Sequence, residues 1–226
     1  MSDPVLLLES VCKSFISTGE KLSILENLDL RIERSSKTVI IGESGCGKST
    51  LLNIIGGLET PTSGSVSAGP FSVQNLGEKE LTTYRSTFLG LVFQFHYLLK
   101  DFTALENVML PAFMAGVKKK VAFDRARSLL VDLKLEHRMN HLPSQMSGGE
   151  RQRAAVARAL VNSPSLVLAD EPTGNLDPAN AETVKELLFS VVSQYSNTLV
   201  LVTHDREIAS HADTCYRLFG GKLVLQ

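Results

Sequence analysis

The sequence predicts an α/β fold with a mainly parallel sheet, an antiparallel β part at its start and a helical insert. Three observations support this fold class. Apolar runs at 37–41, 165–169 and 198–203 alternate with helical patterns, as parallel strands with covering helices do. Before residue 37, short apolar and polar runs alternate, which is typical of antiparallel strands. From about residue 96 to 162 the pattern is helical, so we expect an insert between two parts of one core.

The composition fits one globular domain. The chain has 226 residues, of which 43% are hydrophobic and 21% charged, and this is enough to bury a full core. We therefore expect a single domain at 1–226, with the antiparallel part at about 1–36. Its mainly parallel core would occupy about 37–95 and 163–226, and the helical insert about 96–162.

Net charge, hydropathy and cysteine spacing argue against a nucleic-acid-binding, membrane-spanning or disulfide-rich protein. A formal net charge of −1 gives no general argument for binding nucleic acid. No stretch approaches the ~18 apolar residues of a membrane span, and the first residues lack the pattern of a signal peptide. Cys12, Cys46 and Cys215 have neither metal-ligand spacing nor an obvious disulfide framework, which favours a reducing cytoplasm.

The segment 42–50 is a complete phosphate-binding loop (P-loop), placed after a buried run and before a helical pattern as this motif requires. Its glycines let backbone N–H groups wrap a phosphate chain. Lys48 would pair with the β and γ phosphates of a nucleoside triphosphate, and Ser49 is the expected Mg²⁺ ligand. We interpret Cys46 as a small residue that fits the loop in preference to a redox residue, and the sequence leaves a redox role open. The loop residues are Gly42, Glu43, Ser44, Gly45, Cys46, Gly47, Lys48, Ser49 and Thr50.

Two carboxylates follow the apolar run at 165–169. Adjacent carboxylates at a strand end are often only a solvated turn, but the P-loop upstream favours a catalytic interpretation. Asp170 is then placed to hold Mg²⁺ through its water shell, and Glu171 to orient or deprotonate the attacking water. A further buried run, 198–203, leads directly into His204.

Ser147, Gly148 and Gly149 precede a long run without glycine or proline, which predicts a helix with open N–H groups at its start. These donors and the helix dipole, equivalent to roughly half a positive charge, attract an anion. Ser147 and Glu150 also fit a capping box. An ordinary capped helix and a phosphate site are therefore both compatible with this segment, and they are complementary if Glu150 turns back onto the helix start.

These motifs, in this order, resemble the ATP-binding cassette (ABC) ATPases over essentially the whole chain. The resemblance implies a RecA-like P-loop core and ATP hydrolysis, and it gives four further residues a role. Gln94 matches the Q-loop glutamine, which reaches the metal or the attacking water, and His204 matches the histidine that contacts the γ phosphate. Asp177 matches the D-loop and is also a good helix N-cap before a proline. Phe15 stands where the family places an aromatic ring against adenine.

The same resemblance implies the ligands and partners. ATP would be closed between the P-loop of one copy and the signature segment 147–149 of a second copy. Hydrolysis, assisted by Glu171 and His204, would reopen this homodimer, and Gln94 with the helical insert would pass the motion to integral membrane permease subunits. The chain would then lie on the cytoplasmic face of the bacterial inner membrane, held there by its partners. The Mg²⁺ site would use Ser49, Gln94 and Asp170.

One block, at 93–108, narrows the resemblance to ATPases of lipoprotein-releasing transporters. Two other blocks, 148–153 and 168–177, are shared with macrolide-exporter ATPases and with the ATPase of a cell-division complex. The discriminating block departs from its pattern at Lys100, where proline is expected. The alternatives are therefore a macrolide-exporter-type or cell-division complex, or a soluble ABC ATPase without a transport function. Soluble ABC ATPases usually carry coiled-coil insertions, tandem cassettes or basic extensions, and this sequence has none.

Overall fold

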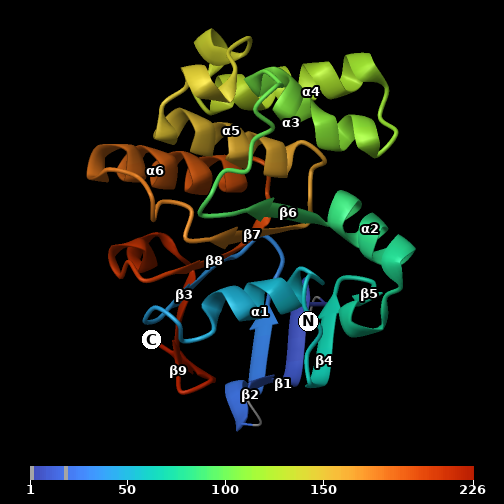
Figure 1. The fold of residues 1–226 in the computed structure, drawn as a ribbon, viewed down its shortest axis with the longest axis vertical. Helices are drawn as coiled ribbons and strands as arrows, with labels where there is room; N and C mark the ends of the chain where they lie inside the picture. Colours follow the sequence, from blue (N-terminus) through green and yellow to red (C-terminus); the bar gives the residue numbers. More distant parts are fainter. Residues whose placement is uncertain (1–2, 18–19) are drawn as a thin grey trace. The chain divides into compact units, whose positions relative to one another are not determined.

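The computed structural model describes residues 3–17 and 20–226 and divides the chain into two compact units. The P-loop unit comprises Met1–Arg85 and Thr198–Gln226, and the signature unit comprises Ser86–Asn197. Figure 1 shows strands and helices in each unit. The predicted fold class is confirmed, because one unit holds the antiparallel sheet and both contain parallel strand pairs.

An antiparallel sheet in the P-loop unit has the strand order β2-β1-β4-β5. Its first two strands are those expected from the alternating pattern before residue 37, and Leu6 pairs with Ile32. The register of β1 shifts between Leu8 and Ser14, so this strand is bulged near Phe15. Two strands that come after the P-loop helix complete the sheet. The bounds are β1 Leu6–Ser17, β2 Glu20–Ile32, β4 Ser63–Ala68 and β5 Phe71–Ser72.

Three parallel strands and a hairpin strand position the P-loop. Strand β3 is parallel to both β8 and β9, and four of its five residues are buried. Gly220 and Gly221, both with positive φ, form the turn of a hairpin between β9 and β10. The strands are β3 Lys37–Ile41, β8 Thr198–Thr203, β9 Thr214–Phe219 and β10 Lys222–Leu225. The helices are α1 Lys48–Ile55 and α2 Glu78–Thr87, which runs into the signature unit in sequence.

The signature unit combines one parallel strand pair with four helices. Helix α5 contacts α3, α4 and α6, and Figure 1 shows it between α6 and the α3–α4 pair. Its buried face is rich in alanine, including Ala154, Ala155 and Ala157, which lets the neighbouring helices approach closely. The elements are β6 Leu89–Val92, β7 Leu166–Asp170, α3 Ala104–Met114, α4 Lys119–Asp132, α5 Gly148–Leu160 and α6 Pro178–Gln194.

The helix starts agree with the local sequence. The predicted capping box of Ser147 with Glu150 is present, and Asp177 caps α6 ahead of Pro178. A second capping box, of Thr103 with Glu106, begins α3. Within residues 3–17 and 20–226, 3-10 turns lie at Val73–Asn75, Glu136–Arg138, Pro143–Gln145 and Glu207–His211. The caps of α5 and α6 fix the first turns of helices that begin at predicted site residues, Ser147 and Asp177.

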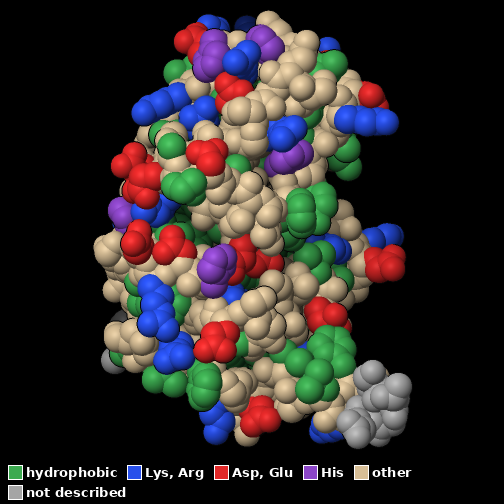
Figure 2. Space-filling model, turned by 60° about the vertical axis from the view of Figure 1, so that its left-hand side comes forward, with side chains coloured by type: hydrophobic (Ala, Val, Ile, Leu, Met, Phe, Trp, Pro, Cys, Tyr) green, Lys and Arg blue, Asp and Glu red, His purple; other side chains and the backbone are tan. Residues whose placement is uncertain are grey.

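The described helices are not membrane spans, and one face of the molecule carries charges of both signs. In residues 3–17 and 20–226, no helix combines the length and apolar content needed to cross a bilayer. On the face drawn in Figure 2, Lys and Arg side chains are interspersed with Asp and Glu. This mixture agrees with the formal net charge of −1.

Candidate functional site

The P-loop connects the end of β3 to the start of α1. Gly42 donates its N–H to the Thr203 carbonyl at 3.2 Å, and Cys46 donates its N–H to the Glu43 carbonyl at 3.3 Å. Gly47 precedes α1 with φ 104°, a left-handed backbone conformation that is strained for any residue other than glycine. Gly47 also has no side chain that could cap the helix. The start of α1 is thus shaped by glycine backbone, the arrangement that lets a phosphate approach N–H groups.

Lys48 is buried within this loop. Its ammonium donates to the carbonyls of Gly42 at 2.8 Å and Glu43 at 3.0 Å, so the cation is held over the loop by the loop's own backbone. Ser49 is exposed, and Cys46 and Thr50 are half-buried. The Lys48 ammonium and the N–H groups at the start of α1 together provide the positive charge and the hydrogen-bond donors that a phosphate chain needs.

His204 follows β8 at the same end of the sheet as the P-loop. Ile41 of β3 pairs in parallel with Thr203 of β8, so Gly42 and His204 each follow one member of this pair. The His204 side chain is exposed. Ligands of open α/β sheets bind at the carboxyl ends of strands, and here both predicted residues lie at that end.

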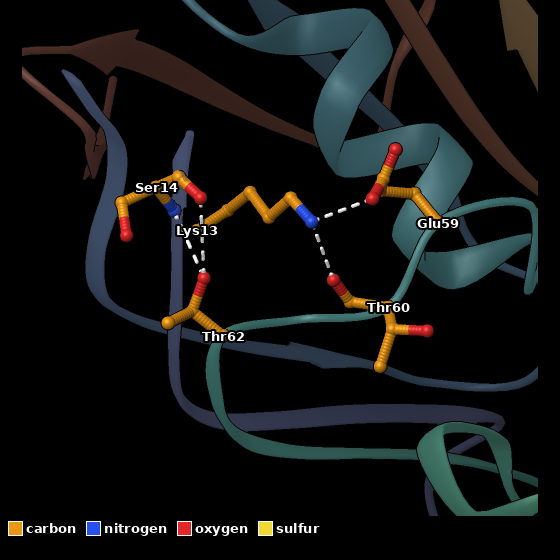
Figure 3. Close-up of polar contacts among 5 residues, drawn as sticks. All are labelled: Lys13, Ser14, Glu59, Thr60 and Thr62. Carbon is orange, nitrogen blue, oxygen red and sulfur yellow. Dashed lines mark hydrogen bonds and ion pairs between the residues drawn. The ribbon is translucent and has the colours of Figure 1, made fainter. Parts of the chain in front are cut away.

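Phe15 lies on β1 with 40% of its surface exposed, so it is not a core side chain. The Lys13 ammonium lies 4.7 Å from the centre of its ring. That ammonium is held by the Glu59 carboxylate at 2.5 Å and by the Thr60 carbonyl at 2.8 Å, as Figure 3 shows. Thr62 exchanges hydrogen bonds with the backbone of Ser14 beside it. One face of the ring is therefore occupied by a fixed cation, and the adenine role of Phe15 stays a prediction.

In the signature unit, Gln94 and the carboxylates follow neighbouring strands. Val92 of β6 pairs in parallel with Ala169 of β7. Gln94 and Asp170 follow these paired residues, so both lie at the carboxyl end of the strand pair. Gln94 donates from Nε2 to the Asn175 side-chain oxygen at 3.2 Å. Asp170 and Glu171 are both half-buried. The P-loop residues lie in the P-loop unit, whereas Gln94, Asp170 and Glu171 lie in the signature unit.

Glu171 has a backbone φ of 44°, in the left-handed region that is costly for glutamate. Its carbonyl accepts a hydrogen bond from the Gly174 N–H at 3.0 Å, which closes a turn directly after β7. Strain of this kind typically costs about 1–3 kcal/mol and concentrates where function fixes a side chain. The strained position coincides with the predicted catalytic carboxylate.

The signature segment is a capped helix start whose acidic residue is turned inward. Ser147 accepts a hydrogen bond from the Glu150 N–H at 3.2 Å, and Glu150 accepts one from the Ser147 N–H at 2.7 Å. Arg138 donates from Nε to the other carboxylate oxygen at 2.8 Å. Burial would raise the pKa of Glu150, but the hydrogen bonds from Ser147 and Arg138 outweigh it and hold the pKa at about 2. The carboxylate is therefore ionised, and both its oxygens are occupied.

Asp177 caps the start of α6 and binds Asn180, whose side chain packs against the signature. Its carboxylate accepts hydrogen bonds from Asn180, from the N–H at 3.1 Å and from the side-chain amide at 2.6 Å. The side-chain and backbone hydrogen bonds from Asn180 lower the pKa of Asp177. Gly149 packs against the same Asn180 side chain. The predicted N-cap is confirmed, while a role in nucleotide binding stays a prediction.

Several residues that the sequence did not single out connect these motifs. Gln152 donates to the Phe93 carbonyl at 2.9 Å, and Arg158 donates to the carbonyls of His96 at 2.8 Å and Tyr97 at 2.7 Å. Helix α5 therefore holds the backbone on both sides of Gln94. Gln152 lies inside the signature block, which could have drawn notice, whereas Arg158 has no local signal beyond a charge on a buried helix face.

Comparisons with known proteins agree with this arrangement. The ABC transporter family profile matches residues 25–174. A Treponema denticola protein described as the lipoprotein-releasing system ATP-binding protein LolD is 63% identical over 223 residues, 99% of each chain. The Treponema pallidum protein of the same description is 55% identical over 224 residues, again 99% of each chain.

A solved structure gives the same result for the fold. It is a dimeric, post-hydrolysis structure of the ATP-binding cassette MJ0796 bound to ADP and Pi, and it is 37% identical to this chain with a TM-score of 0.89. The match covers 98% of this chain and 97% of that one. This chain therefore belongs to the ABC transporter family, as one of its ATP-binding ATPase subunits.

Proposed function

We propose that this chain is the ATP-hydrolysing subunit of a transporter that releases lipoproteins from the inner membrane toward the outer membrane. The observation that carries this proposal is the 63% identity, over 99% of both chains, to the Treponema denticola protein described as part of a lipoprotein-releasing system. The discriminating block at 93–108 supports it from the sequence alone. The chain supplies the energy of the cycle and has no need to touch the lipoprotein itself.

The P-loop is the part that binds the phosphates of ATP. Lys48, held by two loop carbonyls at 2.8 and 3.0 Å, is a cation that can turn to the β and γ phosphates. Ser49, Gln94 and Asp170 supply hydroxyl, amide and carboxylate oxygens, the donor type that Mg²⁺ prefers. When bound, Mg²⁺ neutralises negative charge on the phosphates.

Glu171 and His204 serve the hydrolytic step. Glu171 accepts a proton from, or orients, the attacking water, and the strained φ of 44° supports a fixed direction for its carboxylate. His204 is exposed beyond β8 at the carboxyl end of the sheet, where it can contact the γ phosphate. Gln94 donates a hydrogen bond to Asn175, and when this bond breaks the Gln94 side chain can turn to the metal or the attacking water.

The working form is a homodimer in which each copy completes the other's site. Ser147, Gly148 and Gly149 of one copy meet the phosphates held by the P-loop of the other. Asp177 adjoins this contact through Asn180, which it binds and which packs against Gly149. The dimeric structure of the relative MJ0796 supports this assembly. ATP binding closes the pair, and hydrolysis opens it.

Membrane subunits dock on the helical part of the signature unit. A cavity of about 480 Å³ there is lined mainly by apolar side chains and opens beside the first turn of α3. Phe113 is 54% exposed and Phe123 is 40% exposed, which is costly in water and supports a protein partner. The chain is then peripheral, on the cytoplasmic face of the inner membrane. The apolar lining residues are Phe102, Leu105, Met109, Leu110, Phe113 and Phe123.

The proposal is tested by copurifying the chain with its membrane partners and reconstituting the complex in proteoliposomes that hold a fluorescent lipoprotein. We expect ATP with Mg²⁺ to drive release of the lipoprotein to a soluble acceptor. Glu171→Gln should still bind ATP, and its turnover should fall by about a hundredfold or more, since a general base is worth that much.

The membrane partner and the Glu171→Gln turnover test separate parts of the proposal. A copurified permease-like cell-division protein, or no membrane partner, would reject the lipoprotein function while leaving the ATPase assignment intact. Normal turnover by Glu171→Gln would reject Glu171 as the catalytic carboxylate.

A further inference from the structure

Glu150 poses an electrostatic problem for the signature segment. It lies three residues after Ser147, on the helix start that the proposed function brings to the phosphates of a second copy's ATP. Its side chain is only 12% exposed and its carboxylate is ionised. An uncompensated negative charge at this place would repel the triphosphate.

Arg138 compensates that charge with fixed geometry. Its Nε donates to Glu150 Oε1 at 2.8 Å, while Glu150 Oε2 accepts the Ser147 N–H at 2.7 Å. The two oxygens thus have separate partners, one that caps the helix and one that is a cation. His137 Nε2 lies farther away, at 3.6 Å, and its side chain is 62% exposed, so it contributes less.

The backbone that carries Arg138 is itself anchored. The Leu105 N–H donates to the Met139 carbonyl at 3.0 Å, and the Ala104 N–H donates to the His141 carbonyl at 2.9 Å. The Arg138 carbonyl accepts the His141 N–H at 2.9 Å. The segment directly after Arg138 is therefore hydrogen-bonded to the first turn of α3, which fixes the backbone that carries the Arg138 side chain.

We infer that Arg138 is a positioning residue for the ATP site completed between two copies of this chain. Its guanidinium holds the Glu150 carboxylate back against the helix start and cancels its charge, so that Ser147, Gly148 and Gly149 can meet the phosphates. This inference rests on the proposed function and adds a residue to its site. The low pKa of Glu150 agrees with it, since hydrogen bonds from Ser147 and Arg138 stabilise the ionised form.

The test measures ATP-dependent dimerisation by sedimentation velocity in chains that carry Glu171→Gln, which blocks hydrolysis. We expect Arg138→Gln to raise the dimer dissociation constant about tenfold or more, as an unpaired charge close to a phosphate predicts. Binding of ATP to the chain's own P-loop, measured with a fluorescent ATP analogue at concentrations below dimer formation, should be unchanged.

The decisive variant is the double substitution Arg138→Gln with Glu150→Gln. It removes both charges and keeps an acceptor for the Ser147 N–H, so dimerisation should return to within about threefold of the parent chain. Arg138→Lys, which keeps the charge, should fall between the parent and Arg138→Gln. Arg127→Gln removes an exposed arginine of α4 and serves as the matched control, with no expected effect.

The outcomes separate this inference from the function on which it rests. If Arg138→Gln dimerises as the parent does, or if the double variant is as defective as Arg138→Gln, Arg138 does not act through the Glu150 charge. If the Glu171→Gln parent fails to dimerise with ATP, the proposed homodimer is wrong and the inference is rejected with it.

Discussion

Gly149 and Asn180 meet so closely that a β-carbon on Gly149 would overlap the Asn180 side-chain amide. Asn180 cannot easily move aside, because its amide donates to the Asp177 carboxylate at 2.6 Å. The second glycine of the signature is therefore needed for packing against α6, independently of its proposed contact with a phosphate. The start of α5 and the start of α6 form one connected structure.

Gly149→Ala should lower the free energy of unfolding by about 1–3 kcal/mol, the usual cost of overpacking a tight contact. Urea denaturation measures this change. Combining it with Asn180→Ala should recover part of the loss, because the double variant removes the amide atoms that overlap. Gly148→Ala is the control, since its β-carbon would lie 3.3 Å from a methyl of Leu176, which can shift. An equal loss for both alanine variants would contradict the Asn180 contact.

The helix starts could be predicted from the sequence because a cap is a local structure. Ser147 with Glu150, Thr103 with Glu106, and Asp177 before Pro178 each involve residues within three positions, so spacing alone identifies them. The P-loop strand and helix could be predicted for a similar reason, since glycines, a buried run and a helical pattern are contiguous. The closing hairpin depends on two adjacent glycines.

Contacts between distant segments could not be predicted. The Lys13 ammonium reaches Glu59, which is 46 positions away, and Gln152 reaches the Phe93 carbonyl across 59 positions. Arg138 lies only 12 positions from Glu150, yet a turn and a second 3-10 segment separate them, so no helical or strand period relates the two. One sequence carries no signal for such pairs, because they depend on how elements pack.

The low pKa of Glu150 predicts an acid-sensitive contribution to stability. A carboxyl whose pKa falls from 4.5 to about 2 on folding stabilises the folded chain above pH 4.5, and this stabilisation is lost as the pH falls toward 2. The difference in unfolding free energy between the wild-type chain and Glu150→Gln should therefore shrink by about 1 kcal/mol between pH 5 and pH 3.5. Chemical denaturation at each pH measures it.

Glu106→Gln is the matched control for this pH effect. Glu106 occupies the equivalent place in the other capping box, and hydrogen bonds from the Thr103 backbone and hydroxyl lower its pKa. The Glu106 side chain is exposed to solvent and, among the described residues, has no arginine partner like Arg138. The pH-dependent change in unfolding free energy caused by Glu106→Gln should therefore be smaller than that caused by Glu150→Gln. A larger effect from Glu106→Gln would reject the assignment of the acid sensitivity to the Arg138 pair.

Phe15→Ala should weaken ATP binding by about tenfold, because stacking of a base on an aromatic ring contributes about 1–3 kcal/mol. Binding of inorganic tripolyphosphate should be unchanged, since it has no base. The Lys13 ammonium covers one face of the Phe15 ring at 4.7 Å, and the other face is the one on which adenine would stack. Phe15→Tyr should retain affinity. Equal weakening for both ligands would assign Phe15 a role in the fold and not in base binding.

Cys46 gives a direct measure of whether phosphates occupy the loop. Its thiol is free and half-buried between two glycines of the P-loop. In a chain whose Cys12 and Cys215 are replaced by serine, ATP at about ten times its dissociation constant should slow alkylation of Cys46 about tenfold, because only the ligand-free fraction reacts.

Adenosine at the same concentration should not protect Cys46 from alkylation, because it lacks phosphates. Lys48→Ala should remove the protection by ATP, since it removes the cation that pairs with the phosphates. Equal alkylation rates with and without ATP would place the thiol away from the phosphates and contradict the predicted loop contact.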